Sequence, residues 1–255
     1  MNDTILEVKN VSVDFGGLKA VDSVSVSVKQ WNIHGIIGPN GAGKTTLINL
    51  ICGMTPPSSG VIDFDGVEIQ TLPPYKIAAL GMQRTYQNIN LFKNMTVKEN
   101  VLTGSHLITR TSLYSAVMNN HSKKEDDHIA AEIADKWLAF FGLMEKQDWK
   151  AGRLSYGEQR RLEIARALAA SPKMLLLDEP AAGMNLTEKQ QLADTILAVR
   201  DMGLTIMLVE HNMKLIMKIC DEITVLDHGK LIAEGTPAEV QSNPLVIESY
   251  LGSRK

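Results

Sequence analysis

The chain has 255 residues, of which 44% are hydrophobic and 22% are charged, and its formal net charge is −3. This composition is ordinary for a globular α/β protein, and the charge excludes a protein that coats nucleic acid nonspecifically, because such binding needs a dense basic surface. No run approaches the ~18 apolar residues of a membrane span, and the start MNDTILEVKN is not a secretion signal, so we expect a cytosolic chain. Cys52 and Cys220 lack paired spacing and are expected to be buried thiols.

The N-terminal region predicts an antiparallel β layer. Residues 23–28 alternate strictly between Ser and Val, which is typical of a strand with one buried and one solvated face. Residues 61–69 alternate around Asp65-Gly66, a dipeptide favoured in tight hairpin turns. These strands are expected to form a separate β subdomain.

Between these strands, residues 33–37 predict a strand and residues 45–51 a helix, and the sequence GPNGAGKTT joins them. Its glycines allow several backbone N–H groups to point at one anion, while Lys44 adds a positive charge and Thr45 a hydroxyl for a metal. A helix N-terminus also favours negative charge, so this loop predicts a phosphate-binding site. The residues of this predicted site are Gly38, Pro39, Asn40, Gly41, Ala42, Gly43, Lys44, Thr45 and Thr46.

The middle of the chain predicts mainly helices. Residues 82–87 form an expected strand with Gln87 at its exit, and a helical subdomain is expected at approximately 96–170. Capping-box spacings place helix starts near Thr96, Ser122 and Ser155. One apolar stripe is expected to face the core, and its members are Ile129, Ile133, Trp137, Phe140 and Phe141.

The second half alternates strand with helix, which predicts a mostly parallel central sheet. The apolar run at 174–177 fits a buried strand that places Asp178 and Glu179 at its C-terminal edge, where ligands bind in open α/β sheets. A helix capped at Thr187 and a strand at 205–210 follow, and this strand leads to His211. A final hairpin and a helix that opens at residues 236–237 complete the chain.

These residues suit phosphoryl transfer from ATP, which needs charge neutralisation, a bound metal and an oriented water. Lys44 and the loop amides are expected to hold the phosphates, and Thr45 and Asp178 to position Mg²⁺ directly or through water. Glu179 is expected to polarise a water toward the γ-phosphate. Glu210 could hold His211 as a hydrogen-bonding or protonated group near that phosphate, although an isolated histidine is more often structural.

In this order the motifs resemble those of the ATP-binding subunits of ABC transporters. The match covers nearly the whole chain, and LSYGEQRRLEIARALA, DEPAAGMN and HGKLIAEGTPAEV are most similar to ATPases of branched-chain amino-acid importers. The implied fold is one domain over residues 1–255: a P-loop NTPase core with the predicted sheets and the inserted helical subdomain. The motifs are residues 38–45, TYQNINLF with Gln87, LSYGEQ at 154–159, LLLDEP at 175–180, AAGMN at 181–185 and VEHNM with His211.

The resemblance implies that two such subunits clamp two ATP molecules head to tail. Ser155 and Gly157 of one subunit would reach the γ-phosphate held by Lys44 of the other. Phe15 would stack on adenine. Gln87 would contact Mg²⁺ or the lytic water and would link the ATP site to the membrane partner.

The resemblance also implies the partners and the location of the protein. His211 would touch the γ-phosphate, and closure on ATP would drive membrane permease subunits. The second ATPase subunit would be identical or a sister protein, and an extracytoplasmic solute-binding protein would act indirectly. No nucleic-acid partner is expected, and the chain would be peripheral on the cytoplasmic face of the inner membrane.

Three residues depart from the usual superfamily motifs. Tyr156 stands where Gly is usual in the signature, Asn185 where Asp is usual, and Trp31 where a Gly-containing turn is common. The first two resemble the importer subgroup, so ATPase activity is still expected. The resemblance gives no reason for Trp31.

Three alternative functions have different sequence signatures. A lipopolysaccharide-export ATPase has similar motifs, and the direction of transport cannot be read from an ATP site. A soluble ABC ATPase that acts on ribosomes or DNA usually resembles two fused units or carries a long coiled coil, whereas this chain predicts one compact unit. A regulatory module without turnover would not require the adjacent acids Asp178 and Glu179.

Overall fold

The computed structural model describes residues 3–107 and 121–251, which form two compact units. Unit 1 comprises residues 1–82 and 176–255, and unit 2 comprises residues 83–175. The chain passes between the units within strands β6 (Met82–Arg84) and β7 (Met174–Asp178).

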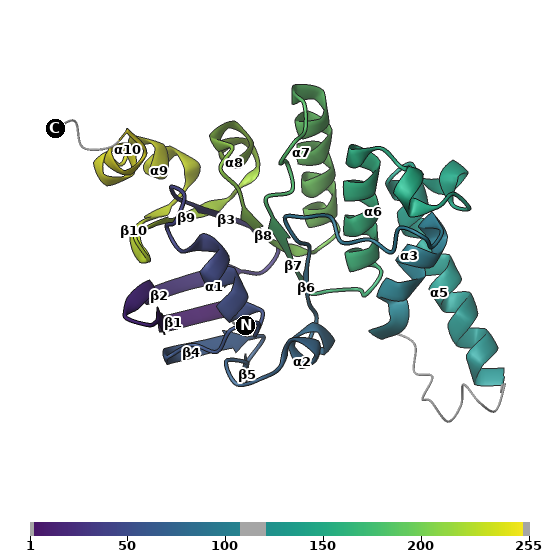
Figure 1. Cartoon of the computed structure of the whole chain (residues 1–255), viewed down its shortest axis with the longest axis horizontal. Coiled ribbons are helices and arrows are strands. Elements are labelled where there is room, and N and C mark those ends of the chain that lie inside the picture. Colours follow the sequence, from purple (N-terminus) through teal and green to yellow (C-terminus); the bar gives the residue numbers. More distant parts are fainter. Residues whose placement is uncertain (1–2, 108–120, 252–255) are drawn as a thin grey trace. The chain divides into compact units, whose positions relative to one another are not determined.

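Unit 1 contains a four-stranded sheet in the order β2-β1-β4-β5, shown in Figure 1. Neighbouring strands pair antiparallel, and Asp65-Gly66 forms the predicted turn between the last two. Val24, Val26 and Val28 are buried while the serines between them are exposed, as the alternation predicts. The strands are β1 (Thr4–Phe15), β2 (Leu18–Lys29), β4 (Ser59–Phe64) and β5 (Val67–Glu68).

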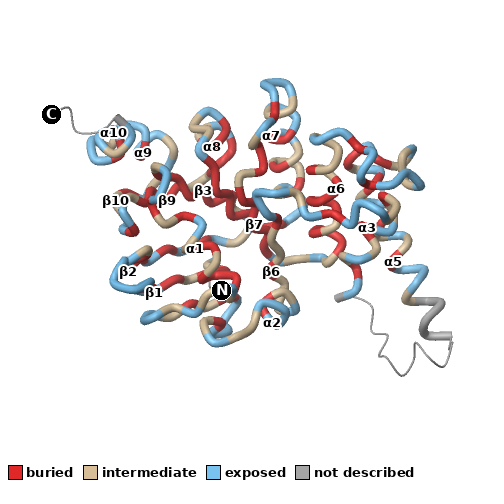
Figure 2. Tube along the Cα trace, viewed as in Figure 1, coloured by how far each residue is buried: buried red, intermediate tan, exposed pale blue. Residues whose placement is uncertain are grey.

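A six-stranded sheet has the order β10-β9-β3-β8-β7-β6. Strand β3 pairs parallel with both β8 and β9, and β10 pairs antiparallel with β9, so the prediction of a mostly parallel sheet is confirmed. Every residue of β3, β7 and β8 is buried, as the red trace in Figure 2 shows for β3 and β7, and this burial fits the mainly apolar sequences of β7 and β8. The other strands of this sheet in unit 1 are β3 (Ile33–Ile37), β8 (Thr205–Val209), β9 (Glu222–Asp227) and β10 (Lys230–Gly235).

The helices of unit 1 lie beside these sheets, and Figure 1 shows α1 between the two of them. The predicted cap of α7 at Thr187 is wrong. Asn185 caps this helix instead, because its Oδ1 accepts from the Glu188 N–H at 2.9 Å while Glu188 bonds back to the Asn185 N–H. The helices are α1 (Lys44–Ile51), α2 (Pro74–Ala79), α7 (Leu186–Asp201), α8 (Met213–Ile219), α9 (Pro237–Ser242) and α10 (Pro244–Leu251).

Unit 2 is built mainly of helices, and the range predicted for a helical subdomain lies within it. The predicted capping boxes at Thr96 and Ser155 are present, with Glu99 and Glu158 as their third helical residues. The capping box predicted at Ser122 involves side chains outside those described. The helices are α3 (Val97–Gly104), α5 (His121–Phe140) and α6 (Tyr156–Leu168), with 3-10 turns at Ser105–Leu107, Met144–Lys146 and Ala151–Arg153.

The apolar stripe predicted along α5 is displaced by one residue. Among the described residues of α5 those buried are Ala130, Ala134 and Leu138, whereas Ile129 is 40% exposed. Phe141, which directly follows the helix, is buried as predicted. Alanine allows close approach to α3 and α6, which both contact this helix, but it adds little to a hydrophobic pattern. The Trp137 ring of the predicted stripe packs edge-on against a neighbouring aromatic ring, 5.7 Å between centroids. Within the described residues, no helix is long and apolar enough to cross a bilayer.

Candidate active site

The phosphate loop predicted at residues 38–46 follows β3 and has a backbone that only glycine tolerates at two points. Gly38 has φ 151°, and a Cβ there would lie 2.1 Å from the Leu226 carbonyl oxygen. Gly43 has φ 98°, and a Cβ there would lie 2.5 Å from the Ala20 oxygen. The loop is therefore pressed between β9 and β2, and this packing fixes its curvature.

Helix α1 begins at Lys44, within the last part of this loop, and Gly43 is its N-cap. Because glycine has no side chain, the first N–H groups of α1 receive no cap from that residue. Those N–H groups and the helix dipole suit an anion such as the phosphates of a nucleotide.

Lys44 lies at the start of α1 and is only 8% exposed. Its Nζ donates to the Gly38 oxygen at 2.7 Å and to the Pro39 oxygen at 2.9 Å, which uses two of the three donors of an ammonium. Burial lowers the pKa of Lys44 below its ordinary value, while the Glu179 and Asp178 carboxylates act in the opposite direction. The Lys44 ammonium is thus held by the loop carbonyls and interacts electrostatically with the two predicted acids, Asp178 and Glu179.

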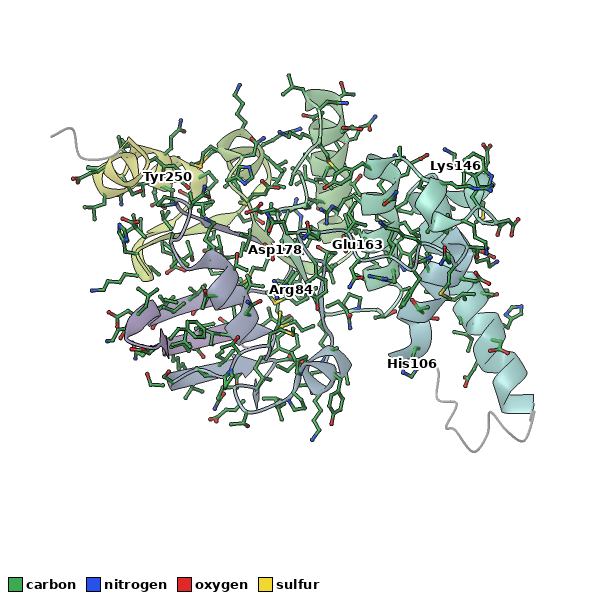
Figure 3. All side chains as sticks on the ribbon, in the orientation of Figure 1. Arg84, His106, Lys146, Glu163, Asp178 and Tyr250 are labelled. Atoms are coloured by element: carbon green, nitrogen blue, oxygen red, sulfur yellow. The ribbon has the colours of Figure 1, made fainter. Side chains whose placement is uncertain are left out.

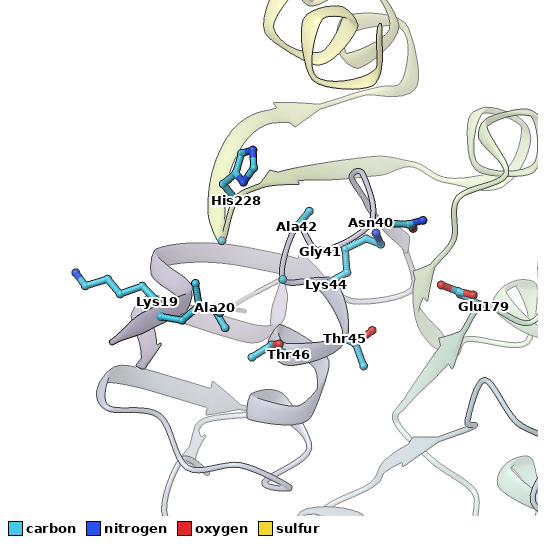
Figure 4. Close-up of a pocket in the computed structure, with 13 residues that line it drawn as sticks. Lys19, Ala20, Asn40, Gly41, Ala42, Lys44, Thr45, Thr46, Glu179 and His228 are labelled. Atoms are coloured by element: carbon cyan, nitrogen blue, oxygen red, sulfur yellow. The ribbon is translucent and has the colours of Figure 1, made fainter. Parts of the chain in front are cut away.

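A cavity of about 350 Å³ opens beside the loop in unit 1. Figure 4 shows the Glu179 carboxylate facing the loop across this cavity, which brings the predicted acid and the predicted phosphate site together. Loop residues 40–46 form one wall, and the remaining lining residues are Leu18, Lys19, Ala20, Glu179, His228 and Gly229.

Sequence reasoning missed five residues of this lining: Leu18, Lys19, Ala20, His228 and Gly229. The first three belong to β2, which pairs with β1, and the last two form the turn between β9 and β10. These residues form no recognisable sequence motif, because residues in strands and turns, including a turn histidine, serve many structural roles. The one signal for Ala20 is the close approach of its carbonyl oxygen to Gly43. This contact depends on the tertiary fold, so the sequence alone does not reveal it.

Asp178, labelled in Figure 3, is the last residue of β7, and Glu179 follows it directly. Asp178 is 4% exposed. Glu179 has φ 45°, a left-handed conformation that costs a non-glycine residue about 1–3 kcal/mol, and its N–H donates to the Val209 oxygen at 2.9 Å. The left-handed residue bends the chain directly after the strand.

Glu210 at the end of β8 joins the segments that follow β7 and β8. Its side chain is buried, with 1% exposure, and its Oε1 accepts from the Ala181 N–H at 2.8 Å. Its Oε2 accepts from the His211 N–H at 3.2 Å and the Asn212 N–H at 3.4 Å. The expectation that Glu210 holds the His211 imidazole is therefore wrong, because the carboxylate binds backbone groups.

The His211 ring stands close to Glu179, on an exposed side chain of the same unit. Its Nδ1 lies 3.8 Å from the Glu179 Oε2, a distance that is too long for a hydrogen bond. The structure thus places both predicted groups at neighbouring strand ends in the six-stranded sheet.

Phe15 lies at the end of β1 and is 52% exposed. It is not among the residues that line the cavity, whereas Leu18, which follows the turn after β1, is one of them. Its stacking on adenine stays a prediction.

Gln87, Ser155 and Gly157 belong to unit 2. Gln87 is exposed in the irregular segment that follows β6, and its carbonyl accepts from Arg160 at 2.7 Å. Ser155 is the exposed N-cap of α6, and Gly157 lies in its first turn. The roles that the resemblance gives these three residues stay predictions.

Trp31 has φ 63°, so it occupies the left-handed conformation for which a glycine is common at this turn. Its N–H donates to the Thr205 Oγ1 at 2.9 Å, which links the turn before β3 to the start of β8. The indole is 61% exposed, and nothing in the structure explains this side chain.

Two protein-family profiles match different parts of the chain. The family profile described as ABC transporter matches residues 21–182, which include both the phosphate loop and the acids after β7. The chain belongs to this family. A second profile, described as a branched-chain amino acid ATP-binding cassette transporter, matches residues 230–255.

Relatives of the family are similar to this chain over its full length. The high-affinity branched-chain amino acid transport ATP-binding protein BraF of Pseudomonas aeruginosa is 44% identical over 99% of both chains. The protein LivG of Escherichia coli, whose name assigns it the same transport, is 42% identical over 99% of both. The ADP conformation of MJ1267, an ATP-binding cassette of an ABC transporter, aligns with a TM-score of 0.85 and 34% identity, covering 98% of this chain and 99% of that one.

Proposed function

We propose that this chain is the ATP-hydrolysing subunit of an importer for branched-chain amino acids. As a member of its family, the chain binds nucleotide and hydrolyses ATP to power transport through membrane permease partners. The solute class is supported by relatives of 42–44% identity over full length whose names specify branched-chain amino acids. The second profile at residues 230–255 supports the same subgroup.

The observation that carries the catalytic proposal is the cavity shared by the phosphate loop and Glu179. The loop amides and Lys44 bind the β- and γ-phosphates, since they combine N–H donors with a positive charge. Glu179 faces the loop from the opposite wall and takes a hydrogen bond from the attacking water, which orients it toward the γ-phosphate. His211 donates to a γ-phosphate oxygen from the neighbouring strand end.

The residues beside the phosphates fit Mg²⁺. The Thr45 hydroxyl and the Asp178 carboxylate are oxygen donors, which this cation prefers, and Gln87 adds an amide oxygen in unit 2. Among the described residues no three His, Cys, Asp or Glu side chains gather as a metal cage, and Mg²⁺ is ordinarily held by one or two protein oxygens plus phosphates. The cation, when bound, neutralises charge on the phosphate oxygens.

The site is completed by a second ATPase subunit, identical or sister, arranged head to tail. Ser155 and Gly157 lie at the N-terminus of α6, which supplies N–H groups to the γ-phosphate held by the other subunit. Phe15 stacks on the adenine ring, because it is exposed at the end of β1, and the turn that follows leads to Leu18, which lines the cavity. Unit 2 acts as the helical subdomain, where Gln87 relays the state of the site to the permease.

In this arrangement the chain is peripheral on the cytoplasmic face of the inner membrane. An extracytoplasmic solute-binding protein delivers the amino acid to the permease and acts on this chain only indirectly. The proposal includes no nucleic-acid partner.

The test is ATP-driven uptake by the native complex, isolated through an affinity tag on this chain and reconstituted into proteoliposomes with its solute receptor. We expect uptake of radiolabelled leucine, isoleucine or valine with ATP inside the vesicle lumen that represents the cytoplasm, and none with Glu179→Gln. Hydrolysis of ATP with uptake of a chemically different solute would contradict the assigned solute class. Export from the ATP-containing side would contradict the assigned direction.

A further inference from the structure

Arg160 is a fully buried charged residue in α6 of unit 2, with 0% exposure. A buried guanidinium is stable only where acceptors surround it. Its Nη1 donates to the Tyr86 oxygen at 2.6 Å and to the Glu163 Oε2 at 2.7 Å. Its Nη2 donates to the Gln87 oxygen at 2.7 Å and lies 3.4 Å from the Tyr156 hydroxyl. One side chain therefore contacts both the Gln87 segment and the start of α6.

Glu163 extends this network to the other end of the Gln87 segment. Its Oε1 accepts from the Asn90 N–H at 3.2 Å, so residues 86–90 are fixed to α6 at both ends. Burial raises the pKa of Glu163, whereas Arg160 and the Asn90 N–H lower it. Figure 3 labels Glu163 on α6. The arginine and the glutamate lie three residues apart, which places both on one face of the helix.

The Gln87 segment has little structure of its own. Residues 85–90 belong to no helix or strand, so no ladder of backbone bonds fixes where Gln87 points. Among the described contacts of this segment, the two carbonyls at Tyr86 and Gln87 are held by the same guanidinium. The position of Gln87 relative to α6 thus depends on a rigid, planar fork of donors.

The other end of the network is Tyr156, the residue that departs from the usual glycine of the signature. It is the first residue of α6, directly after the N-cap Ser155. Its ring centroid lies 6.0 Å from the Arg160 guanidinium carbon, and the hydroxyl is the fourth neighbour of that group. A glycine at this position could make neither contact.

We propose that Arg160 is a positioning residue that couples the N-terminus of α6 to Gln87. The inference rests on the proposed function, in which Ser155 and Gly157 contact ATP of the partner subunit and Gln87 serves its own ATP site. The guanidinium makes the start of α6 and the Gln87 segment one body within unit 2. Engagement of a γ-phosphate at α6 therefore fixes Gln87 at the same time, and Tyr156 supports the coupling from the signature side.

The test is a double-mutant cycle on the full chain, with Arg160→Lys and Gln87→Ala measured singly and together. Lysine keeps a positive charge beside Glu163 but cannot bond both carbonyls through a planar fork. We expect Arg160→Lys to lower kcat about tenfold with KM for ATP within about twofold, because orientation and not ground-state binding is lost. The double variant is expected to lose no more than Gln87→Ala alone, since Arg160 acts through Gln87.

Arg200→Lys is the matched control, because the Arg200 guanidinium on α7 also donates to two residues, to Asp201 at 2.7 Å and to Asp221 at 3.3 Å, and both lie outside the Arg160 network. It is expected to keep kcat within about twofold. If Arg160→Lys does not fold, as a thermal melt would show, Glu163→Gln keeps the arginine and weakens the tie to Asn90. That variant is expected to lower kcat about threefold, again without further loss beside Gln87→Ala.

These measurements test the proposed function and the coupling by Arg160 separately. Absence of ATP hydrolysis in the wild-type chain and in its complex would contradict the proposed function. With hydrolysis present, an unchanged kcat in Arg160→Lys would overturn the coupling alone. Losses that multiply in the double variant would also overturn it, since they would show that Arg160 acts by a general effect on folding or packing.

Discussion

The two walls of the nucleotide cavity are built by different means. The phosphate loop is a contiguous stretch whose shape comes from backbone, with Gly38 and Gly43 in conformations that admit no Cβ. The opposite wall carries Glu179, and the buried Glu210 carboxylate ties its segment to the segment of His211. The first wall is thus fixed by local sequence and close packing, and the second by one carboxylate between distant segments.

This difference predicts that mutations in the two walls have different effects on the protein. A change in the loop removes the place where the phosphates bind, so it affects nucleotide affinity and folding. A change behind the opposite wall leaves the phosphates bound and disturbs only the orientation of the reacting groups, so it affects kcat.

Apart from a change of Glu179 itself, the largest effect is expected from Lys44→Ala. Loss of the ammonium that is bound to the loop carbonyls removes a positive charge from beside the bound phosphates, and kcat should fall about 10²- to 10³-fold with weaker ATP binding. Steady-state hydrolysis and nucleotide titration measure both. Lys19→Ala is the control, because this lysine lines the same cavity but pairs with Asp22, and it should change kcat by less than about threefold.

Gly38→Ala tests the packing of the same wall. A Cβ at 2.1 Å from the Leu226 oxygen forces the loop or β9 to move, so the unfolding free energy should fall by about 3 kcal/mol and ATP binding should weaken. Gly41→Ala is a matched control, since Gly41 also has a positive φ but no atom within 4 Å of its Cβ position. It should cost about 1 kcal/mol. Equal losses in denaturant unfolding would show that packing against Leu226 does not matter.

Glu210→Gln tests the other wall. The amide supplies one acceptor oxygen where the carboxylate serves three N–H groups, so the segments of Glu179 and His211 lose part of their anchoring. We expect kcat to fall about tenfold with ATP affinity unchanged. Glu234→Gln changes an exposed glutamate on β10 near the Thr224 hydroxyl and should leave kcat unchanged. A loss of affinity without a loss of kcat in Glu210→Gln would remove the distinction between the walls.

Asn185→Ala is expected to have the smallest effect. The side chain caps α7 just beyond the second wall, and its removal should lower the unfolding free energy by about 1 kcal/mol. Asn185→Asp keeps an acceptor oxygen and should retain the stability. Thermal or denaturant unfolding of the three proteins checks this, and equal stability of all three would exclude the capping role.

The sequence predicts the first wall almost completely, because a phosphate loop is contiguous and its glycines have one geometric use. It also predicts Glu179 at a strand end, since a buried apolar run followed by acids has a clear meaning. It does not predict the bond partners of Glu210, which depend on how β7 and β8 lie beside each other. For the same reason the network of Arg160 is invisible, because Tyr86 and Gln87 lie far from α6 in the chain.

Smaller errors have similar causes. The cap of α7 was expected at Thr187, although Asn185 has the same spacing to an acid, and only the helix start distinguishes the two. The stripe on α5 was placed on large residues, whereas Ala130 and Ala134 form the buried face because the neighbouring helices approach closely. Patterns of hydrophobicity give the type of element more reliably than its buried face.

The central claim is that a carboxylate from a separate segment activates water against a triphosphate held by the loop. The most direct test is Glu179→Gln, with ATP binding and steady-state hydrolysis measured on the same preparation. The account predicts a loss of hydrolysis of about 10³-fold, an ATP dissociation constant within about threefold of wild type, and an ATP-dependent dimer in size-exclusion chromatography. Hydrolysis within about twofold of wild type would contradict the account.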